Sequence, residues 1–369
     1  GTITVSGLSN NVFIGTTSDT VDLTINSGGV LTTSSNNLDT PETMHLRTQT
    51  LTLAGGTLAW AGTRSSQWGT WNLGTDIIVT QDSTITANNL TISKNPLSLN
   101  IAATKTLTIS GTIISSTEAI SCGCDSNALS VNGGGGSYTG TVVLSGSNTY
   151  KGATNVVQGV LRASNSSALG GTTNGTTVSS GAALEINGTI SSLPEDIFIN
   201  GTGISSGGAI RMISTSGAST LAGVITTQTA SRINNDAATN AFTISTGGVV
   251  NTGGLTFGIG NTGAINVTGV ISDVGSITKD LTGTGRLVLS AANTYQGATT
   301  VTNGVLQVRN NDALGSATAG TGTSYTVVSS PAAIEFNGAS ALSIPEELRI
   351  NGTGFSESST VNGALRQIS

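Results

Sequence analysis

A long internal repeat constrains the fold of this chain more than any other feature of its sequence. Residues 140–154 reappear as residues 285–299, and each copy contains the string Asn-Thr-Tyr-x-Gly-Ala-Thr. The match continues in the same order through further pairs of segments: 159–161 with 304–306, 168–170 with 313–315, 184–188 with 334–338, 194–195 with 345–346, 199–203 with 350–354, and 209–211 with 364–366. Small insertions change the spacing between these segments, as an architecture of stacked repeats tolerates at its turns.

Short segments of alternating apolar and polar residues recur along the chain and predict β-strands. Examples are Leu51-Thr52-Leu53, Leu107-Thr108-Ile109 and Ile265-Asn266-Val267, and Gly, Asn or Ser follows almost every such segment. A period of two places one apolar face toward a core, and the Gly, Asn and Ser residues turn the chain. No window of helical length keeps a helical period, so we expect little or no α-helix.

Strand and turn units of this size predict a solenoid. A unit of about 20 to 25 residues cannot enclose a core alone, but stacked coils bury one continuous column. The expected fold is therefore all-β, a right-handed parallel β-helix (β-solenoid) of about sixteen coils. A barrel or sandwich is the structural competitor, but it would join neighbouring strands by two-residue hairpin turns. We expect one continuous β-solenoid over 1–369, an excerpt of a longer chain, with related repeat blocks at 139–214 and 284–369.

The composition supports a buried core and argues against several kinds of partner. Hydrophobic residues make up 36% of the chain and charged residues 9%, unlike disordered chains with few apolar residues and high net charge. The 13 Lys and Arg residues are scattered and the net charge is −6, so we expect no nucleic-acid partner. No apolar run is long enough to span a bilayer, and we expect no cofactor.

The segments 283–308 and 140–161 closely resemble the autotransporter-associated β-strand repeat of bacterial autotransporter passenger domains. The resemblance rests on the motif residues Asn148, Thr149, Tyr150, Gly152, Asn293, Thr294, Tyr295 and Gly297. It implies a parallel β-helix that is exported across the outer membrane, with a repeat that assists secretion and folding of the passenger. The chain departs from the pattern in a minor way at Ala291, which stands where the other copy has Gly146. The chain also contains no C-terminal translocator barrel, which leaves its secretion route unproven.

The string Cys122-Gly123-Cys124 is the sharpest local feature of the sequence. A disulfide between Cys122 and Cys124 would suit an oxidising surface environment, whereas two buried thiols are the alternative because so small a ring is strained. One Cys pair and a single His supply too few soft ligands for a metal site.

Acidic residues are too sparse to predict a hydrolase. The close acid pairs are Glu195 with Asp196 and Glu346 with Glu347, and each pair follows a Pro at corresponding repeat positions. We expect solvated turns there rather than the paired carboxylates of a glycosidase. His45 lacks a matching Ser nucleophile and is expected to be a surface or packing residue. The chain is therefore expected not to be an enzyme.

Trp60, Trp68 and Trp71 form the only aromatic cluster in the sequence. Exposed Trp side chains on a solenoid can stack on sugar rings or anchor a partner, which makes them candidate contacts for a ligand. A loop folded over the side of the solenoid is the structural alternative.

These features predict a structural or adhesive β-solenoid that is presented on a bacterial surface, either anchored to the outer membrane or released. A subunit of an extracellular filament or sheath is the first alternative, with self-association end to end or side by side. A carbohydrate-binding or carbohydrate-active β-helix is the second. A host surface or a glycan is the expected class of ligand.

Overall fold

The computed structural model describes residues 2–5, 12–14, 22–33, 42–46, 50–60, 69–87, 89–115, 127–281, 283–316, 325–338, 341–357, 360–361 and 363–368. The chain divides into two compact units, Gly1–Thr177 and Val178–Ser369. Both units consist of short strands joined by turns, and 1% of the chain is helical. The fold is an all-β parallel β-solenoid, as the repeat predicts. The prediction of one continuous solenoid over 1–369 stays a prediction.

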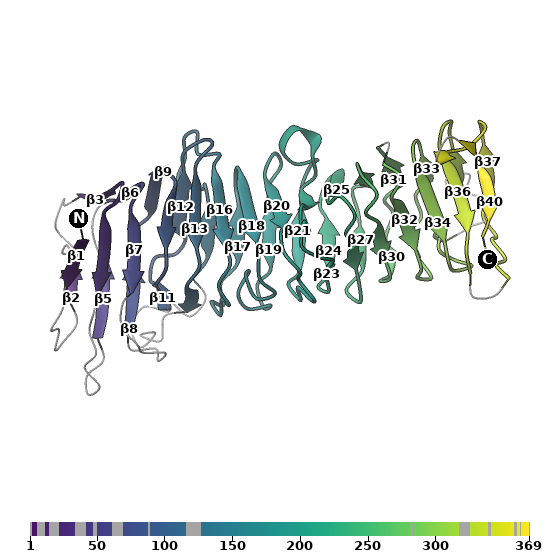
Figure 1. The fold of residues 1–369 in the computed structure, drawn as a ribbon. Helices are drawn as coiled ribbons and strands as arrows, with labels where there is room; N and C mark the ends of the chain where they lie inside the picture. Colours follow the sequence, from purple (N-terminus) through teal and green to yellow (C-terminus); the bar gives the residue numbers. More distant parts are fainter. Residues whose placement is uncertain are drawn as a thin grey trace. The chain divides into compact units, whose positions relative to one another are not determined.

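The first unit is built from three parallel sheets, seen as stacked strands in Figure 1. One sheet runs through β1 (Thr2–Val5), β4 (Val30–Thr33), β7 (Thr57–Trp60), β10 (Ser83–Ile85), β13 (Thr106–Ile109), β16 (Thr141–Leu144) and β18 (Val160–Ala163). The second runs through β2 (Val12–Ile14), β5 (Glu42–Leu46), β8 (Gly69–Leu73), β11 (Asn89–Ile92) and β14 (Thr112–Ser115). The third runs through β3 (Asp22–Asn26), β6 (Thr50–Ala54), β9 (Ile77–Gln81), β12 (Leu97–Ile101), β15 (Leu129–Val131) and β17 (Thr154–Val156). The strand β19 (Thr176–Val178) includes the boundary between the units.

The second unit has the same kind of architecture. One sheet runs through β20 (Ala183–Ile186), β22 (Ile210–Met212), β25 (Ser231–Asn235), β28 (Leu255–Ile259), β31 (Ile277–Asp280), β33 (Thr299–Val301), β35 (Thr326–Val328) and β37 (Leu348–Ile350). The second runs through β23 (Ser219–Leu221), β26 (Phe242–Ile244), β29 (Ile265–Val267), β32 (Arg286–Leu289), β34 (Val305–Val308), β36 (Ala333–Phe336) and β40 (Leu365–Gln367). The third runs through β21 (Ile197–Ile199), β24 (Ile225–Thr227), β27 (Val249–Asn251) and β30 (Ile271–Ser272). A short hairpin, β38 (Ser356–Glu357) with β39 (Thr360–Val361), and the 3₁₀ turn η2 (Ile204–Ser206) complete the elements.

The coils differ in length, and their number differs slightly from the expected sixteen. In the first unit Asp22 pairs with Thr50, so that coil advances by 28 residues. In the second unit Ile277 pairs with Thr299, a shorter advance. The uneven spacing of the repeat in the sequence therefore reflects loops of variable length between strands that pair in parallel, with a register shift between Leu53 and Ala54 where β6 pairs with β9.

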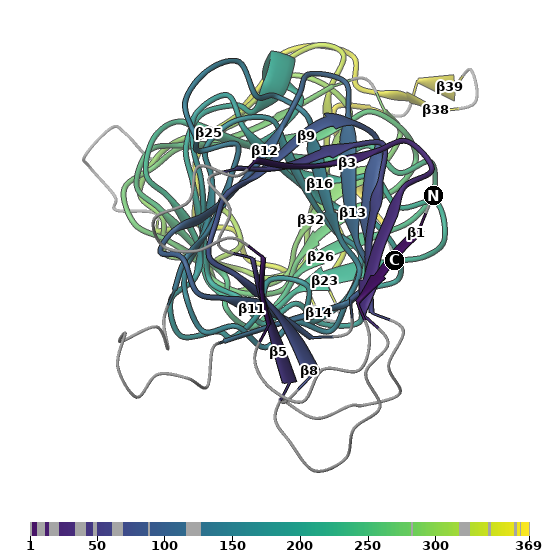
Figure 2. The ribbon, with the colours of Figure 1, turned by 90° about the vertical axis from the view of Figure 1, so that its left-hand side faces the viewer.

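Inward-facing side chains form continuous rows through the stack. Figure 2 shows the first unit from the end where β1 lies, with β3, β9 and β12 on one face, β1 and β13 on another, and β5, β8 and β11 on the third. The middle residue of most three-residue strands is half-buried, and the residues on either side of it are buried, as in Ile225–Thr227. One row in the second unit joins residues at the same position in successive strands: Leu184, Ile210, Ile233, Phe257, Lys279, Val301 and Val328. Stacked identical positions thus bury the apolar face that the alternation predicts.

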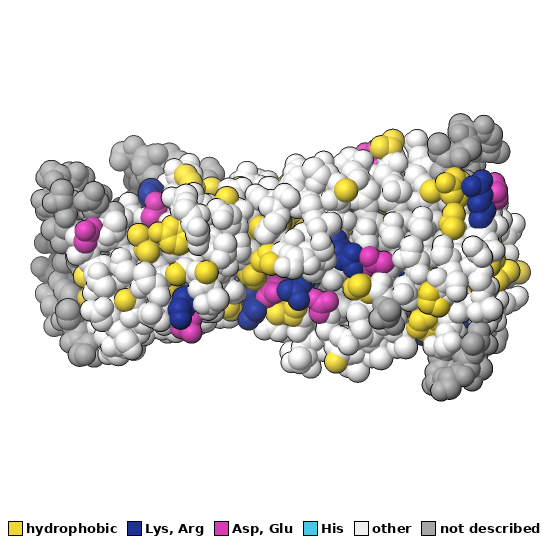
Figure 3. All heavy atoms as spheres, turned by 90° about the horizontal axis from the view of Figure 1, so that it is seen from above, with side chains coloured by type: hydrophobic (Ala, Val, Ile, Leu, Met, Phe, Trp, Pro, Cys, Tyr) yellow, Lys and Arg dark blue, Asp and Glu magenta, His cyan; other side chains and the backbone are white. Residues whose placement is uncertain are grey.

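The visible surface carries few charges. Figure 3 shows mostly uncharged polar side chains and backbone, with Lys and Arg lying next to Asp and Glu where charges occur. Within the described ranges, no helix combines the length and the apolar character that crossing a bilayer requires.

Candidate functional site

The two repeat copies place the motif residues at corners of the solenoid, which we call the first corner (148–152) and the second corner (293–297). Asn148 is buried; its Oδ1 accepts a hydrogen bond from the Ile113 backbone N–H at 2.8 Å, and its Nδ2 donates to the Ala168 carbonyl at 2.6 Å. Ile113 belongs to the preceding coil and Ala168 to the following one. One side chain therefore bonds to the coils on both sides of its own.

The second corner repeats these contacts. The Asn293 Oδ1 accepts from the Ile271 N–H at 2.8 Å, and its Nδ2 donates to the Ala313 carbonyl at 2.6 Å. An amide is suited to this role because it carries an acceptor and two donors on one short side chain. The sequence match between the corners therefore corresponds to a match in their hydrogen bonds.

The tyrosine of each corner is fully buried and keeps a partner for its hydroxyl. The Tyr150 hydroxyl lies 2.6 Å from the Thr154 Oγ1, and the Tyr295 hydroxyl lies 2.5 Å from the Thr299 Oγ1. Burial raises the pKa of Tyr295, although the hydrogen bond with Thr299 opposes the rise. Each ring therefore fills the core with its hydroxyl hydrogen-bonded.

The Ala-Leu-Gly segment of the next coil closes over this tyrosine. Gly170 has a φ of +85°, and a Cβ at this position would lie 2.6 Å from the Tyr150 carbonyl oxygen and 2.9 Å from the ring carbon Cζ. Gly315 has a φ of +96°, with the same crowding against Tyr295. Only glycine combines this backbone conformation with so close an approach. The repetition of 168–170 as 313–315 is the sequence signal for this contact.

The remaining motif residues complete the corner. Thr149 and Thr294 have exposed side chains, and their backbone N–H groups donate to the carbonyls of Ile113 and Ile271, both at 2.8 Å. Gly152 is buried and Gly297 is half-buried. The structure thus brings the predicted motif residues of each copy together, and their role in secretion stays a prediction.

Two further buried polar side chains bond to turn carbonyls, and sequence reasoning did not identify them. Asn132 donates from its Nδ2 to the carbonyls of Gly140 and Gln158, at 3.0 and 2.9 Å. The Lys279 Nζ donates to the carbonyls of Asp280 and Asn303, at 2.7 and 3.2 Å. Asn303 holds the repeat position of Gln158, so two different residue types cap the same turn.

Lys279 occupies an inward position among apolar neighbours. Its pKa falls from 10.5 to about 8 because burial disfavours the charged form; the charge of Asp280 opposes the change and that of Arg232 adds to it. Its aliphatic stem extends through the core and its ammonium reaches turn carbonyls. Lys279 is the charged residue in an otherwise apolar row of inward-facing positions, and no pattern in the sequence predicted that it would face inward.

A buried polar column extends from the second corner through successive coils. Tyr295 contacts Thr299, Thr299 pairs in register with Thr326, and the Thr326 Oγ1 donates to the Glu346 Oε1 at 3.0 Å. The other carboxylate oxygen of Glu346 has no hydrogen-bond partner among the described residues. Burial raises the pKa of Glu346 from 4.5 to about 7, although the bond from Thr326 opposes the rise.

The acids that follow Pro194 and Pro345 were expected in solvated turns, and this prediction is wrong for two of them. Glu195 is 3% exposed and Glu346 is 7% exposed, whereas Glu347 is exposed and Asp196 is half-buried. Successive residues point to opposite sides of extended backbone, so the first acid of each pair faces inward. The acids therefore do not form the open pair of carboxylates that a glycosidase needs.

A glutamate and an arginine on neighbouring coils form an ion pair in both repeat blocks. Glu185 pairs in register with Arg211, and the Arg211 Nη1 lies 3.0 Å from the Glu185 Oε1. Glu335 pairs in register with Arg366 and forms an ion pair with it. Both residues recur at matched positions of the two blocks, which is the sequence signal that would have identified the pair.

Glu335 gathers further partners. Arg286 donates to both of its oxygens, at 2.8 and 3.1 Å, and the Gln307 Nε2 donates at 3.1 Å. Burial raises the pKa of the carboxyl, but the hydrogen bonds from Arg286 and Gln307 and the charges of Arg286 and Arg366 outweigh it and lower the pKa below 4.5. The side chain of Glu335 is 1% exposed, whereas that of Arg286 is 32% exposed, so a buried carboxylate is paired with an arginine that reaches the surface.

Another ion pair joins two strands that are separated by a third strand. The Arg232 guanidinium donates to both carboxylate oxygens of Asp280, at 2.7 and 2.8 Å, passing over β28. Gly258 lies between them, and a Cβ there would lie 2.6 Å from the Arg232 Nη2 and 2.1 Å from the Asn234 Oδ1. The missing side chain of Gly258 leaves room for a bridge that spans two coils.

The other predicted site residues are only partly described. The backbones of Trp60 and Trp71 lie in β7 and β8, which belong to different sheets. Trp68, Cys122 and Cys124 lie outside the described residues. The ligand contact of the tryptophans and the disulfide therefore stay predictions.

The described side chains support a structural rather than a catalytic role for the corners. The buried asparagines bond to main-chain groups of neighbouring coils, and the buried tyrosines bond to threonine hydroxyls of their own coil. No group of three or more His, Cys, Asp or Glu residues that could hold a metal ion occurs within the described ranges. The corners hold coils together, and they define a parallel β-solenoid with two specialised coils.

Comparison with known proteins assigns those coils to a family of repeats. A family model described as passenger-associated-transport-repeat matches residues 137–163 and 281–308, which contain both corners. The resemblance seen in the sequence is thereby confirmed at both sites, and the chain is autotransporter-passenger-like.

One curated relative points in the same direction. The chain is 30% identical over 211 residues to "Adhesin BmaC autotransporter" of Brucella suis biovar 1 (strain 1330). The match covers 57% of this chain and 4% of the length of that protein. No solved structure matches the chain.

Proposed function

We propose that this chain is a surface-exposed stretch of a bacterial autotransporter passenger that has a structural and adhesive role. The observation that carries the proposal is the pair of passenger-associated-transport repeats, at 137–163 and 281–308. The similarity to an autotransporter adhesin supports the adhesive role. Buried side chains that bond coil to coil support a scaffold, because they stiffen the stack without creating a reactive site.

The outward positions of the strands supply the surface for adhesion in this proposal. The middle residue of a strand such as Ile225–Thr227 or Val249–Asn251 is half-buried while its neighbours are buried. Successive coils repeat this position at the spacing of adjacent strands, about 4.8 Å. A host glycan or a host-surface protein would meet rows of these outward side chains, which include polar residues such as Thr226 and apolar residues such as Val250.

Immunogold electron microscopy of intact producing cells tests the location. Antibody raised against the 369-residue chain should label the envelope of unlysed cells, and mild external protease should remove the label. An antibody against a cytoplasmic protein, applied to the same cells, controls for lysis. Labelling that appears only after lysis would overturn the proposal.

Adhesion needs its own measurement. Beads coated with the folded chain should bind to host cells or to immobilised host glycans more strongly than beads coated with the heat-unfolded chain. The variant Asp196→Asn should bind as well as the parent, because the proposal gives this acid no catalytic role. Turnover of a polysaccharide that is lost in Asp196→Asn would instead favour a carbohydrate-active β-helix.

A filament subunit is a second candidate, favoured by the low charge of the chain, because charged residues form 9% of it and repulsion between copies is correspondingly weak. In this case the purified chain would form linear assemblies whose length grows with concentration. Analytical ultracentrifugation of the 369-residue chain distinguishes the two, since a strictly monomeric chain contradicts the filament.

A further inference from the structure

A hollow of about 330 Å³ opens on the surface beside the second corner. Its lining comes from three successive coils and includes Ala292 and Thr294 from the corner, Asp312, Gly315 and Ser316 from the turn of the next coil, and Pro345 from the coil after that. Ligand sites usually enclose about 300 to 1,000 Å³. The hollow therefore has a size that suits one small group, such as a single sugar ring.

Three polar side chains of the hollow are available to a ligand. The side chains of Thr294, Asp312 and Ser316 are exposed, and they form no hydrogen bond with any other described residue. Each hydroxyl can donate and accept a hydrogen bond, and the carboxylate can accept several. Ala292 and Pro345 add apolar surface. The hollow thus combines unused polar groups with apolar walls, as ligand sites do.

Main-chain contacts of the second corner hold two of these polar residues in place. The Asn293 N–H donates to the Asp312 carbonyl at 3.0 Å, and the Ser316 N–H donates to the Tyr295 carbonyl at 2.9 Å. Asn293 and Tyr295 are themselves buried and hydrogen-bonded in the corner. The backbone that presents Asp312 and Ser316 is therefore fixed before any ligand binds.

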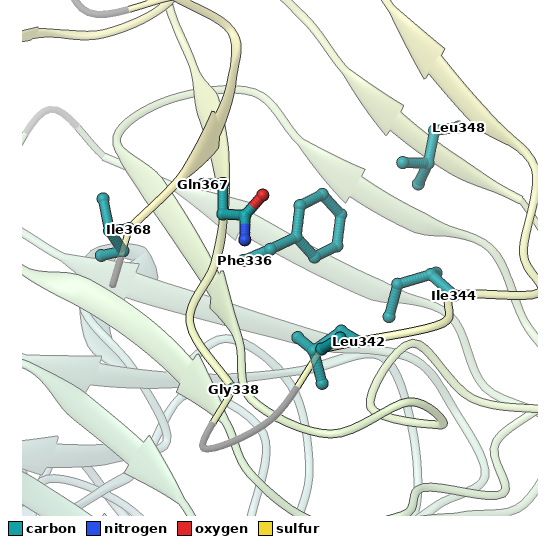
Figure 4. A pocket seen from close by; sticks show the side chains of 8 residues that line it. Phe336, Gly338, Leu342, Ile344, Leu348, Gln367 and Ile368 are labelled. Carbon is teal, nitrogen blue, oxygen red and sulfur yellow. The ribbon is translucent and has the colours of Figure 1, made fainter.

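The segment that carries Pro345 is fixed as well. The Ser343 N–H donates to the Asn311 Oδ1 at 3.0 Å, which joins this segment to the turn next to Asp312. Figure 4 shows Ile344 among the side chains that surround Phe336 of β36. Pro345 therefore follows a segment that is held both by a hydrogen bond and by apolar packing.

The first corner provides an internal reference for the hollow. Asp312 holds the repeat position of Ser167, and Ser316 holds that of Gly171. The turn is otherwise the same, because the Asn148 N–H donates to the Ser167 carbonyl at 3.1 Å, as in the second corner. The carboxylate and the second hydroxyl therefore distinguish the second corner without being needed for its fold.

The chemistry of the lining favours an uncharged sugar. One carboxylate supplies too few oxygen ligands for a divalent cation, and its charge repels an anion. Sugar hydroxyls donate to a carboxylate and exchange hydrogen bonds with Thr and Ser hydroxyls, while the C–H groups of the ring pack on apolar surface.

We propose that this hollow binds an uncharged hexopyranose residue of a host glycan. Asp312 accepts hydrogen bonds from the sugar hydroxyls, Thr294 and Ser316 bond to neighbouring hydroxyls, and the ring packs against Pro345. The inference rests on the adhesive role proposed above, and it adds a ligand class and the residues that recognise it.

A glycan array tests the site with the fluorescently labelled 369-residue chain. We expect binding to glycans that end in glucose, galactose or mannose, and none to sialylated or sulfated glycans. The double variant Asp312→Ser with Ser316→Gly gives the second corner the residues of the first. It should keep the melting temperature of the parent and bind at least about tenfold more weakly. Ser167→Ala in the first corner is the matched control and should bind as the parent does.

A second variant makes the result independent of the turn. Asp312→Asn keeps the shape of the side chain and removes its charge, and it should also weaken binding. Equal binding by the parent and the Asp312 variants would overturn the inference, as would binding to anionic glycans alone. If the parent binds no glycan but beads coated with it still bind host cells, the inference fails and the adhesive role stands. Binding to neither would overturn both.

Discussion

Asn148 and Asn293 show how a single side chain can organise a solenoid. Each contacts main-chain groups of the coil before it and of the coil after it, and each is almost completely removed from water. A buried main-chain group that loses its partner pays the cost of desolvation without compensation. These residues therefore fix the spacing of three coils at once.

Truncating the first corner should be costly. Asn148→Ala leaves the Ile113 N–H and the Ala168 carbonyl without their side-chain partner, so we expect a loss on the order of 2 to 5 kcal/mol in the free energy of unfolding. Denaturant unfolding followed by circular dichroism measures the loss. Asn174→Ala is the matched control, because Asn174 is exposed and donates only to the Lys151 carbonyl. Similar losses in both variants would contradict the role of the corner.

The carboxyl of Glu346 should make stability depend on pH. Its pKa is about 7 in the folded chain and near 4.5 when unfolded, so the folded state binds more protons between these values. This contribution to stability is complete below about pH 4.5 and is lost as pH rises to about 7. We expect Glu346→Gln to gain thermal stability relative to the parent between pH 5 and pH 8.

The difference between variant and parent isolates Glu346, because other groups titrate in both proteins. Glu335 has the opposite tendency, since its lowered pKa stabilises the fold above pH 4.5 and this stabilisation fades as pH falls. The exposed neighbour Glu347→Gln serves as the control and should show no comparable trend. If the difference in melting temperature between Glu346→Gln and the parent is constant across this pH range, the titration of Glu346 does not contribute to the pH dependence of stability.

At the level of residues, the sequence revealed which positions matter but not what they contact. The repetition of Asn-Thr-Tyr identified the corners, yet the partners of Asn148 lie 35 and 20 residues away. The backbone groups that contact the Asn148 amide depend on the lengths of the neighbouring coils. A single sequence does not specify these lengths. Glu346 looked like a turn residue because a Pro precedes it, and only the direction of its side chain explains its burial.

At the level of elements, the strands behave as short units that stack coil on coil. Most three-residue strands contribute two buried residues and one half-buried middle residue, and strands of successive coils pair in parallel. Alternation in the sequence was sufficient to predict such strands. It did not predict the ion pair between Arg232 and Asp280. This ion pair crosses β28 at Gly258, where the absence of a side chain leaves room for the arginine.

Filling the space at Gly258 should break that bridge. Gly258→Ala places a Cβ against Asn234 and Arg232, and we expect a destabilisation of about 1 to 3 kcal/mol. Gly260→Ala is the matched control, because nothing lies within 4 Å of a Cβ there. Adding Asp280→Asn should cost less in the Gly258→Ala background than in the parent, as a double-mutant cycle would measure. Equal costs in both backgrounds would show that the bridge survives.

At the level of the whole molecule, each coil contacts mainly the coils next to it. Stability in such a fold is approximately a sum of coil terms and nearest-neighbour terms. The repeat made this architecture predictable because a period of this length has few physical explanations. The differing lengths of the coils were not predictable, because they depend on the loops between the strands.

Removing one complete coil from the second unit should preserve the fold. Leu255 pairs with Ile277, so deletion of residues 255–276 joins Gly254 to Ile277 and returns every following strand to its former face. We expect this variant to keep a β-sheet circular dichroism spectrum and a cooperative transition. Deletion of residues 255–265 removes about half a coil, which misaligns the later strands, and should abolish the transition. Equal behaviour of the two deletions would contradict the register.

Most bonds between coils are neutral, which has a consequence for the response of the fold to salt. Coils are joined mainly by main-chain hydrogen bonds, amides and hydroxyls, with a few ion pairs such as those of Arg211, Arg232 and Glu335, and charged residues form 9% of the chain. Dissolved ions screen exposed charges strongly and neutral dipoles hardly at all. We therefore expect the unfolding midpoint of this chain to change little with the salt concentration of the medium.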